Sequence, residues 1–206
     1  MYIPRFNLTT DRNETVDFMR RFGFATIVNV KDGLPIATHL PFAVTVEGDE
    51  VVLTSHFARA NEQWKWIERG KTLVVFSEPH AYISTVHYDS PVNVPTWNYV
   101  SVHAYGQGRL LTDAAQALQA LERTIESYDK SFRSQWEGMP QDYRMKMLNG
   151  IVAFEVRVDD LQGKKKLSQN RSEAERERIM DALGRSGDRN EQLISEYMGR
   201  ESGKER

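Results

Sequence analysis

The segment "TSHFARAN", residues 54–61, combines hydroxyl, guanidinium and amide groups at the end of an expected strand. Ser55 closes that strand, Arg59 lies where the chain turns, and Asn61 heads an expected helix. Such a mixture suits a phosphate monoester, because a guanidinium fork binds in bidentate geometry and the free amides of a helix start favour an anion. A polar turn with an ordinary surface arginine is the alternative interpretation.

Aromatic and amide side chains alternate in "VPTWNYVSVHAYG", residues 94–106. On a strand, Trp97 and Tyr99 share one face while Asn98 lies on the other. Large aromatic planes beside an amide suit a flat heteroaromatic ligand, which needs ring contacts and a few hydrogen bonds. An aromatic barrel face or a dimer seam would have the same composition.

The segment "THLPF", residues 38–42, contains a proline within an expected strand. Pro41 cannot donate a hydrogen bond to a neighbouring strand, so backbone groups near His39 and Leu40 are free to face a ligand. A bulge or an edge position explains the proline equally well.

The run "KKKLSQNRS", residues 164–172, is polar except for one leucine. It is open to interpretation as a solvated linker, a nucleic-acid patch or part of a binding site. The acidic "EAERE" follows at once and no aromatic residue is interleaved, which disfavours nucleic acid. Leu167 favours a segment that is docked in part over a free linker.

Other common chemistries lack their sequence signatures. The five histidines show no HxxxH spacing and the chain has no cysteine, so we predict no metal site. GxSxG, GxGxxG and Walker sequences are absent as well, and no catalytic residue is identified.

Composition indicates one main domain in a chain of 206 residues. The 27 lysines and arginines nearly balance the 29 acidic residues, so no global field argues for nucleic acid or an anionic membrane. No apolar run approaches the roughly 20 residues that span a bilayer. We expect a cytoplasmic protein without membrane contact.

The pattern of elements predicts a mainly β protein with helices, of the α+β class. Short β-rich runs begin at Phe24, and their connections are too short for crossover helices, so the pairing should be antiparallel. Closure into a small barrel would remove exposed edges. Helices are expected at residues 11–22, 60–69 and 113–132, and two more lie between residues 172 and 198.

Five motifs together carry a family resemblance: "MYIP", "HFARAN", "PHAYIS", "VPTWNY" and "GKKKLSQNRS". In this order they resemble the PaiB family of FMN-binding negative transcriptional regulators, from Met1 to about Leu183. The resemblance implies an antiparallel FMN-binding split barrel of six to seven strands. It also implies a homodimer with flavin sites at the subunit interface. We therefore expect a split-barrel domain at residues 1–163, a C-terminal arm with helices at 164–199 and a disordered tail at 200–206.

The resemblance also implies a set of FMN-binding residues. The residues expected to bind the FMN phosphate are Ser55, Arg59 and Asn61, and those on the strand along the isoalloxazine are His39 and Leu40. The residues expected to line the flavin or the partner subunit are Trp97, Asn98 and Tyr99. An arm that closes the site is expected to contribute Lys166, Gln169 and Asn170. The sequence departs from the family pattern at His87, where a tryptophan is usual, and at Glu62, where a proline is usual.

The function implied by the resemblance is FMN binding with negative regulation of transcription. The segment 172–198 is a helix, loop and helix, yet Glu173, Glu175 and Glu177 would face DNA phosphates badly, so DNA contact is not derivable from the sequence. An FMN-dependent oxidoreductase of the flavin reductase, pyridoxamine-phosphate oxidase or haem-degrading type is the alternative. A structural dimer without flavin is the third.

Overall fold

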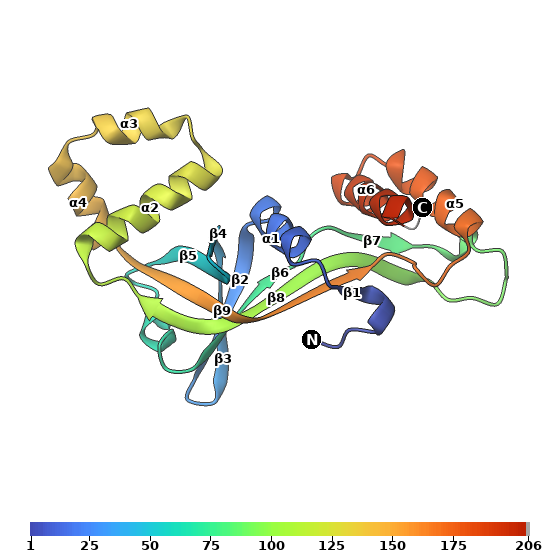
Figure 1. The fold of residues 1–206 in the computed structure, drawn as a ribbon, viewed down its shortest axis with the longest axis horizontal. Coiled ribbons are helices and arrows are strands. Elements are labelled where there is room, and N and C mark those ends of the chain that lie inside the picture. The colour runs from blue at the N-terminus through green and yellow to red at the C-terminus, as the bar shows by residue number, and fades with distance from the viewer. Residues whose placement is uncertain (205–206) are drawn as a thin grey trace. The chain divides into compact units, whose positions relative to one another are not determined.

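The protein is described by a computed structural model over residues 1–204, in which the chain forms two compact units. Unit 1 comprises Met1–Asp11, Ser77–Val102 and the chain from Gln162 onward, and unit 2 comprises Arg12–Phe76 and His103–Leu161. Two long strands, β8 (Thr96–Leu110) and β9 (Ile151–Lys166), contribute residues to both units (Figure 1). Each unit is described below by itself.

Unit 2 is built on an antiparallel sheet with the strand order β3-β2-β6-β8-β9-β5-β4. Its other strands are β2 (Phe24–Lys31), β3 (Leu34–Pro41), β4 (Ala43–Glu47), β5 (Glu50–Ala58) and β6 (Lys71–Phe76). The predicted antiparallel split-barrel fold is confirmed, although β3 and β4 end an open path instead of closing a barrel within residues 1–204.

The sheet has nine strands, more than the six to seven that we expected. One reason is the break at Phe42, which separates β3 from β4 where a single strand was expected. The Phe42 amide leaves the ladder and donates to the carbonyl of Gly23 at 2.8 Å, directly after the proline that cannot donate. The short β1 (Leu8–Thr9), which the sequence pattern did not reveal, adds the other strand.

The core of unit 2 is aromatic. Phe57 and Phe154 stack with ring centroids 4.7 Å apart, and Phe42 meets Phe76 and Phe154 edge to face at 6.1 Å. All four side chains are fully buried. The helix α1 (Arg12–Arg21) contributes the buried Met19 to the apolar interior of the unit.

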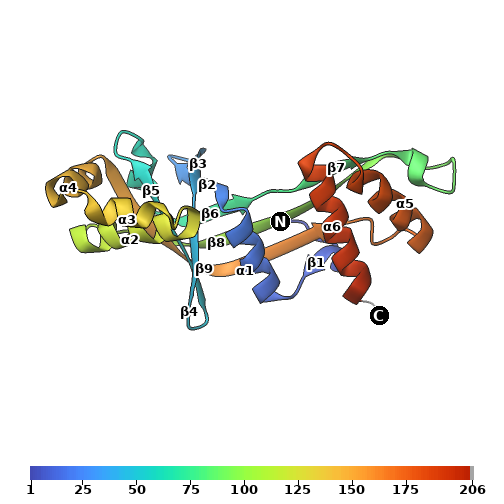
Figure 2. The same ribbon diagram turned by 90° about the horizontal axis from the view of Figure 1, so that it is seen from above.

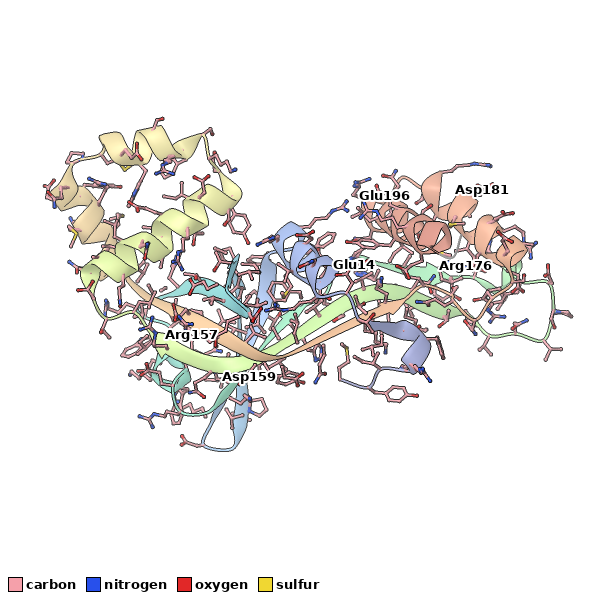
Figure 3. All side chains as sticks on the ribbon, in the orientation of Figure 1. Glu14, Arg157, Asp159, Arg176, Asp181 and Glu196 are labelled. Carbon is pink, nitrogen blue, oxygen red and sulfur yellow. The ribbon has the colours of Figure 1, made fainter. Side chains whose placement is uncertain are left out.

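Strands β5 and β9 pair over their whole shared length in unit 2, with Val52 opposite Arg157. The Arg157 side chain, labelled in Figure 3, donates to Glu155 at 3.1 Å and to Glu50 at 2.5 Å. These contacts tie β9 to the β4–β5 hairpin at the surface, where ion pairs contribute little each.

Three helices of unit 2 lie between β8 and β9 in the chain: α2 (Ala114–Tyr128), α3 (Phe132–Gly138) and α4 (Gln141–Asn149) (Figure 1). Asp113 caps α2 by accepting from the amides of Ala115 and Gln116. The Tyr128 hydroxyl donates to the Phe42 carbonyl at 3.1 Å and docks the helix on the sheet. The expected helix at 113–132 is thus α2, and α4 was not expected.

Unit 1 contains the far ends of β8 and β9 together with β1, β7 (His80–Ile83), α5 (Glu173–Gly184) and α6 (Arg189–Lys204). Strand β1 pairs with β9, with Leu8 opposite Lys164, and β7 pairs with β8. Helices α5 and α6 pack together, and α6 contacts β7 (Figure 2). Two short 3-10 helices, η1 (Arg5–Asn7) and η3 (Thr85–His87), complete the unit.

The C-terminal region differs from the sequence-based expectation in two respects. The last strand was expected to end at Val158, but β9 continues to Lys166, because β1 supplies a hydrogen-bonding partner for residues 163 and 164. Helix α6 includes residues 200–204, for which the sequence predicted disorder, while residues 205 and 206 of that tail lie outside the described part. In the described part of the chain, every helix is too short or too polar to cross a membrane.

We predict that Gly106→Ala destabilises unit 2. A Cβ at this position would lie 2.1 Å from the Arg157 carbonyl oxygen and 2.8 Å from its carbon, both backbone atoms of the neighbouring strand. We expect the free energy of unfolding to fall by about 2–3 kcal/mol, the usual cost of overpacking, measured by urea denaturation. Gly70→Ala is the matched control, since its Cβ meets nothing within 4 Å. Equal unfolding midpoints for the two variants would contradict the prediction.

Candidate functional site

A cavity in unit 1 has a volume of about 450 Å³. Three segments line it: the N-terminal residues 2–7, the start of β8 around residues 94–99, and residues 164–171 at the end of β9. This size is in the range of small-molecule and cofactor pockets, roughly 300–1,000 Å³. It brings together five of the expected site residues, namely Asn98, Tyr99, Lys166, Gln169 and Asn170.

The three consecutive lysines point to two different faces of β9. Successive side chains on a strand alternate, so Lys164 and Lys166 line the cavity, whereas Lys165 does not. Lys165 instead donates to Glu201 of α6 at 2.6 Å. The "KKK" run is therefore part of a strand and not a solvated linker. One face of it lines the cavity, and the other bonds to α6.

The two cavity lysines are held by neutral groups. Lys164 is 8% exposed, and its Nζ lies 3.1 Å from the Tyr2 carbonyl oxygen and 5.1 Å from the centroid of the Tyr99 ring. The Nζ of Lys166 donates to the Trp97 carbonyl at 2.9 Å and to the Thr96 hydroxyl. Burial lowers the pKa of Lys166, Tyr99 raises it, and the nearby Lys164 lowers it further.

The loop after β9 is docked on the protein. Leu167 is fully buried, which confirms that this part of the arm packs against the protein. The Gln169 side chain accepts from the Leu167 amide at 2.7 Å and donates to the Lys165 carbonyl at 2.6 Å. The Ser168 hydroxyl donates to Asn98 at 3.1 Å. Gln169 and Asn98 thus shape the cavity wall through contacts within the protein.

Trp97 lies outside the cavity. Its side chain is 52% exposed, and its ring meets Tyr82 edge to face with centroids 5.8 Å apart. Tyr82 lies opposite Trp97 on the neighbouring strand β7, so the pair covers the outer face of this hairpin. The sequence interpretation allowed either a flavin wall or a subunit seam for Trp97. Its exposure on this face is typical of a seam.

The expected phosphate residues, all in unit 2, use their donors on protein groups. Ser55 donates to the Pro41 carbonyl at 2.6 Å. Arg59 donates through Nε to the Asn149 carbonyl at 2.6 Å and through Nη2 to the Ile151 carbonyl at 2.8 Å. A guanidinium has five donors, so these two hydrogen bonds do not exclude a phosphate at this position.

Asn61 is similarly engaged. Its amide oxygen accepts from the Gln63 amide at 3.1 Å and its nitrogen donates to Thr38 at 2.9 Å. It caps η2 (Glu62–Trp66), a short 3-10 helix in place of the longer helix that we expected at residues 60–69. The phosphate role of Ser55, Arg59 and Asn61 stays a prediction.

The two expected residues on β3 lie at the edge of the sheet in unit 2. His39 is exposed and its ring stacks on Phe24 with centroids 6.3 Å apart. Leu40 is half-buried and lies opposite Ala25 on β2. Their placement along the flavin also stays a prediction.

The cavity residues that the sequence interpretation missed include Tyr2, Asn7, Lys164 and Arg171. Strand alternation would have found Lys164, had residues 164–166 been recognised as a strand. Asn7 is 3% exposed, and its buried Oδ1 has no hydrogen-bond partner among the described residues. Asn7 lies in the cavity wall because β1 pairs with β9, and no local sequence pattern predicts this pairing.

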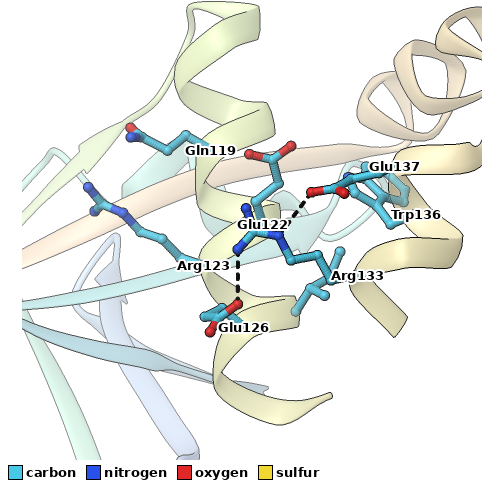
Figure 4. A pocket seen from close by; sticks show the side chains of 8 residues that line it. Gln119, Glu122, Arg123, Glu126, Arg133, Trp136 and Glu137 are labelled. Carbon is cyan, nitrogen blue, oxygen red and sulfur yellow. Dashed lines mark hydrogen bonds and ion pairs between the residues drawn. The ribbon is translucent and has the colours of Figure 1, made fainter. Parts of the chain in front are cut away.

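A second cavity, of about 230 Å³, lies among the helices of unit 2 (Figure 4). Arg133 crosses it and pairs with Glu137 at 2.9 Å and with Glu126 at 3.2 Å, as Figure 4 shows. Because the carboxylates here neutralise the guanidinium, this cavity has no excess of positive charge for an anion. The cavity of unit 1 differs in this respect.

The fold is that of flavin-binding split-barrel proteins. The flavocytochrome Anf3 of Azotobacter vinelandii superposes with a TM-score of 0.63 at 18% identity, covering 80% of this chain and 72% of that one. The FAD and heme binding protein of Mycobacterium smegmatis gives a TM-score of 0.60 at 17% identity, covering 78% and 73%. At these identities the likeness concerns the fold alone.

The chain belongs to the PaiB family, since the family described as "Putative FMN-binding domain" matches residues 1–160 and a full-length relative is similar throughout. That relative is "Protease synthase and sporulation protein PAI 2" of Bacillus subtilis, 37% identical over 201 residues, or 96% of each chain. An uncharacterized protein of Saccharomyces cerevisiae is 32% identical over 127 residues, covering 57% of this chain and 75% of that one. The expected cofactor, FMN, is thereby confirmed.

The residues of the unit 1 cavity fit this cofactor. FMN presents a flat ring system and a dianionic phosphate, and the cavity offers the rings of Tyr2 and Tyr99 beside the ammonium groups of Lys164 and Lys166. The unpaired Oδ1 of Asn7 could accept a hydrogen bond from a ring N–H. Aromatic planes with a few placed polar groups are what such a ligand requires.

We predict that Arg59→Ala lowers the free energy of unfolding by about 1 kcal/mol, because it removes two hydrogen bonds to the backbone before and at the start of β9. Thermal or urea denaturation measures the effect. Arg69→Ala is the control, since that guanidinium only covers the Trp66 ring, at 4.6 Å from its centroid. Unfolding of Arg59→Ala at the same midpoint as Arg69→Ala would show that the two Arg59 hydrogen bonds do not contribute to the free energy of unfolding.

Proposed function

We propose that this protein is a homodimeric, FMN-binding negative regulator of transcription, and that the unit 1 cavity is part of its FMN site. The observation that carries the proposal is membership of the PaiB family over almost the whole chain, together with a cavity of matching chemistry. When bound, FMN supplies redox chemistry. The chain's own residues hold the ring and the phosphate, and the buried loop after β9 fixes their positions.

Exposed apolar side chains of unit 1 support the homodimer. Val86, Val92 and Val94 are 78%, 88% and 74% exposed, and Trp97 and Tyr82 are half exposed beside their shared hairpin. Interfaces are enriched in such aromatic residues, and a partner subunit would bury these side chains. A partner subunit that covers this surface would also complete a flavin site at the interface.

The regulatory role rests on the relative's name, which ties it to protease synthesis and sporulation. Helix α5 begins with a capping box in which Glu175 and Ser172 bond reciprocally, and Glu173 and Glu177 are exposed beside it. This acidic start would repel DNA phosphates. Any DNA contact in our proposal therefore uses another surface of the dimer.

We predict that the purified protein binds FMN stoichiometrically per chain. The visible spectrum of the protein and fluorescence quenching of added FMN measure this directly. Size-exclusion chromatography with light scattering should give the mass of two chains. Failure to bind at micromolar FMN, under conditions where the protein is folded, would refute the proposed cofactor role.

We further predict that regulation, and not turnover, is the activity. In a mobility-shift assay at low salt, the FMN-loaded dimer should retard a fragment of its regulated promoter, and retardation should weaken as salt rises. NAD(P)H should be consumed no faster than by free FMN. Rapid NAD(P)H oxidation without any mobility shift would instead favour the oxidoreductase alternative.

A further inference from the structure

We propose that the unit 1 cavity binds the reduced, anionic form of FMN more tightly than the oxidised form, and that Lys164 and Lys166 are the groups that favour the added negative charge. This inference rests on the proposed function and deepens it, because flavin occupancy then responds to reduction. It concerns the ring of the cofactor alone, since both redox forms carry the same phosphate.

The cavity carries positive charge that no carboxylate in its wall neutralises. Three basic residues line it, Lys164, Lys166 and Arg171, and none of the lining residues is acidic. Within the described residues, neither lysine forms an ion pair, although Lys164 is only 8% exposed. Burying an ammonium group without a counter-charge is costly, and such groups are normally paired. Negative charge on a ligand in the cavity lowers this cost.

The two lysines act on the same face of β9. Burial lowers the pKa of Lys166, Tyr99 raises it, and Lys164 lowers it again, as expected of two ammonium groups that repel each other. Lys165, on the opposite face, donates to Glu201 at 2.6 Å and so has its counter-charge. The unbalanced positive charge of this strand therefore lies on the cavity face alone.

The chemistry of the flavin ring makes this charge selective. Two electrons and one proton convert the neutral oxidised ring into the reduced anion, whose charge is shared by N1 and the C2 carbonyl, whereas two electrons and two protons give a neutral reduced ring. Charged groups beside the ring nitrogens are one of the means by which a protein tunes a flavin. An ammonium group attracts the anion by its charge, and it serves the oxidised ring only as a hydrogen-bond donor.

The other polar and aromatic groups of the cavity serve both redox forms alike. Tyr2 and Tyr99 supply aromatic surface for a flat ring, whatever its charge. The buried Oδ1 of Asn7, which has no partner among the described residues, is an acceptor for a ring N–H of either form. The lysines are therefore the groups in this wall that distinguish the reduced anion from the oxidised ring.

The test is anaerobic calorimetry of the wild-type protein with oxidised FMN and with FMN reduced by dithionite. We expect reduced FMN to bind roughly 10-fold more tightly, within the usual range of such couplings. That ratio places the midpoint potential of bound FMN about 30 mV above that of free FMN, because this is the value of a tenfold change in the equilibrium constant for a two-electron couple. Since both forms carry the phosphate, the ratio does not depend on where the phosphate is held.

The lysines are tested one at a time. Lys164→Gln and Lys166→Gln should each lower the ratio of affinities about threefold, whereas Lys166→Arg keeps the charge and should preserve the ratio. Lys165→Gln is the matched control, because it removes the same charge from the opposite face of the same strand, and it should leave the ratio unchanged. Thermal melting verifies that each variant is folded.

The pH dependence of the midpoint potential separates a charge effect from a packing effect. One proton for two electrons gives a slope of about 30 mV per pH unit, and two protons give about 60 mV. An ammonium group favours the anion over its protonated form, so wild type should keep the shallower slope to a lower pH than Lys166→Gln does. A variant that merely loosened the cavity would not move this change of slope.

Equal affinity of the wild-type protein for both forms of FMN would overturn the inference while FMN binding stands. The same holds if the ratio survives in both glutamine variants of the cavity lysines, or if Lys165→Gln lowers it as much as they do. If neither form of FMN binds to the folded wild-type protein, the proposed cofactor role fails and this inference fails with it.

Discussion

The alternation of side chains at the end of β9 is the constraint on which the site depends. A strand must send Lys164 and Lys166 to one face and Lys165 to the other. The first face is a cavity with aromatic walls, and the second is covered by α6 through the ion pair to Glu201. One short stretch of backbone thus lines the cavity on one face and bonds to the C-terminal helix on the other.

The elements around β9 in unit 1 stabilise this arrangement. Pairing with β1 fixes the register, because Leu8 opposite Lys164 places the N-terminal segment against the cavity. On the other side, the buried Asn98 accepts from Ser168 and contacts the Met198 sulfur at 3.6 Å, which links β8, the loop after β9 and α6. A ligand in the cavity therefore contacts backbone that the helices also hold.

Much of the fold could be predicted from sequence. Short connections between β-rich runs indicated antiparallel pairing, and motif order identified the family. The strand β1 was missed, because a two-residue strand has no periodicity and exists only through its pairing with β9. The division of one expected strand into β3 and β4 at Phe42 was missed as well. The extension of β9 was missed for a related reason, since three lysines have low strand propensity and need β1 beside them.

The structure brings part of the expected site together: Lys166, Tyr99 and Asn170 line one cavity, because the resemblance named segments that the fold places side by side. The role of these residues toward FMN stays a prediction. Local composition did not show that the Arg59 guanidinium donates to backbone carbonyls, because only the tertiary structure brings those carbonyls within reach. It did not place Lys164 in the cavity wall, because residues 164–166 were not recognised as a strand.

The most direct measurement is a crystal structure of the FMN-bound protein. Our account predicts that the flavin occupies the unit 1 cavity, in contact with the Tyr99 and Lys166 side chains and with the Lys165–Glu201 ion pair intact. FMN bound elsewhere on the protein, with this cavity empty, would contradict it.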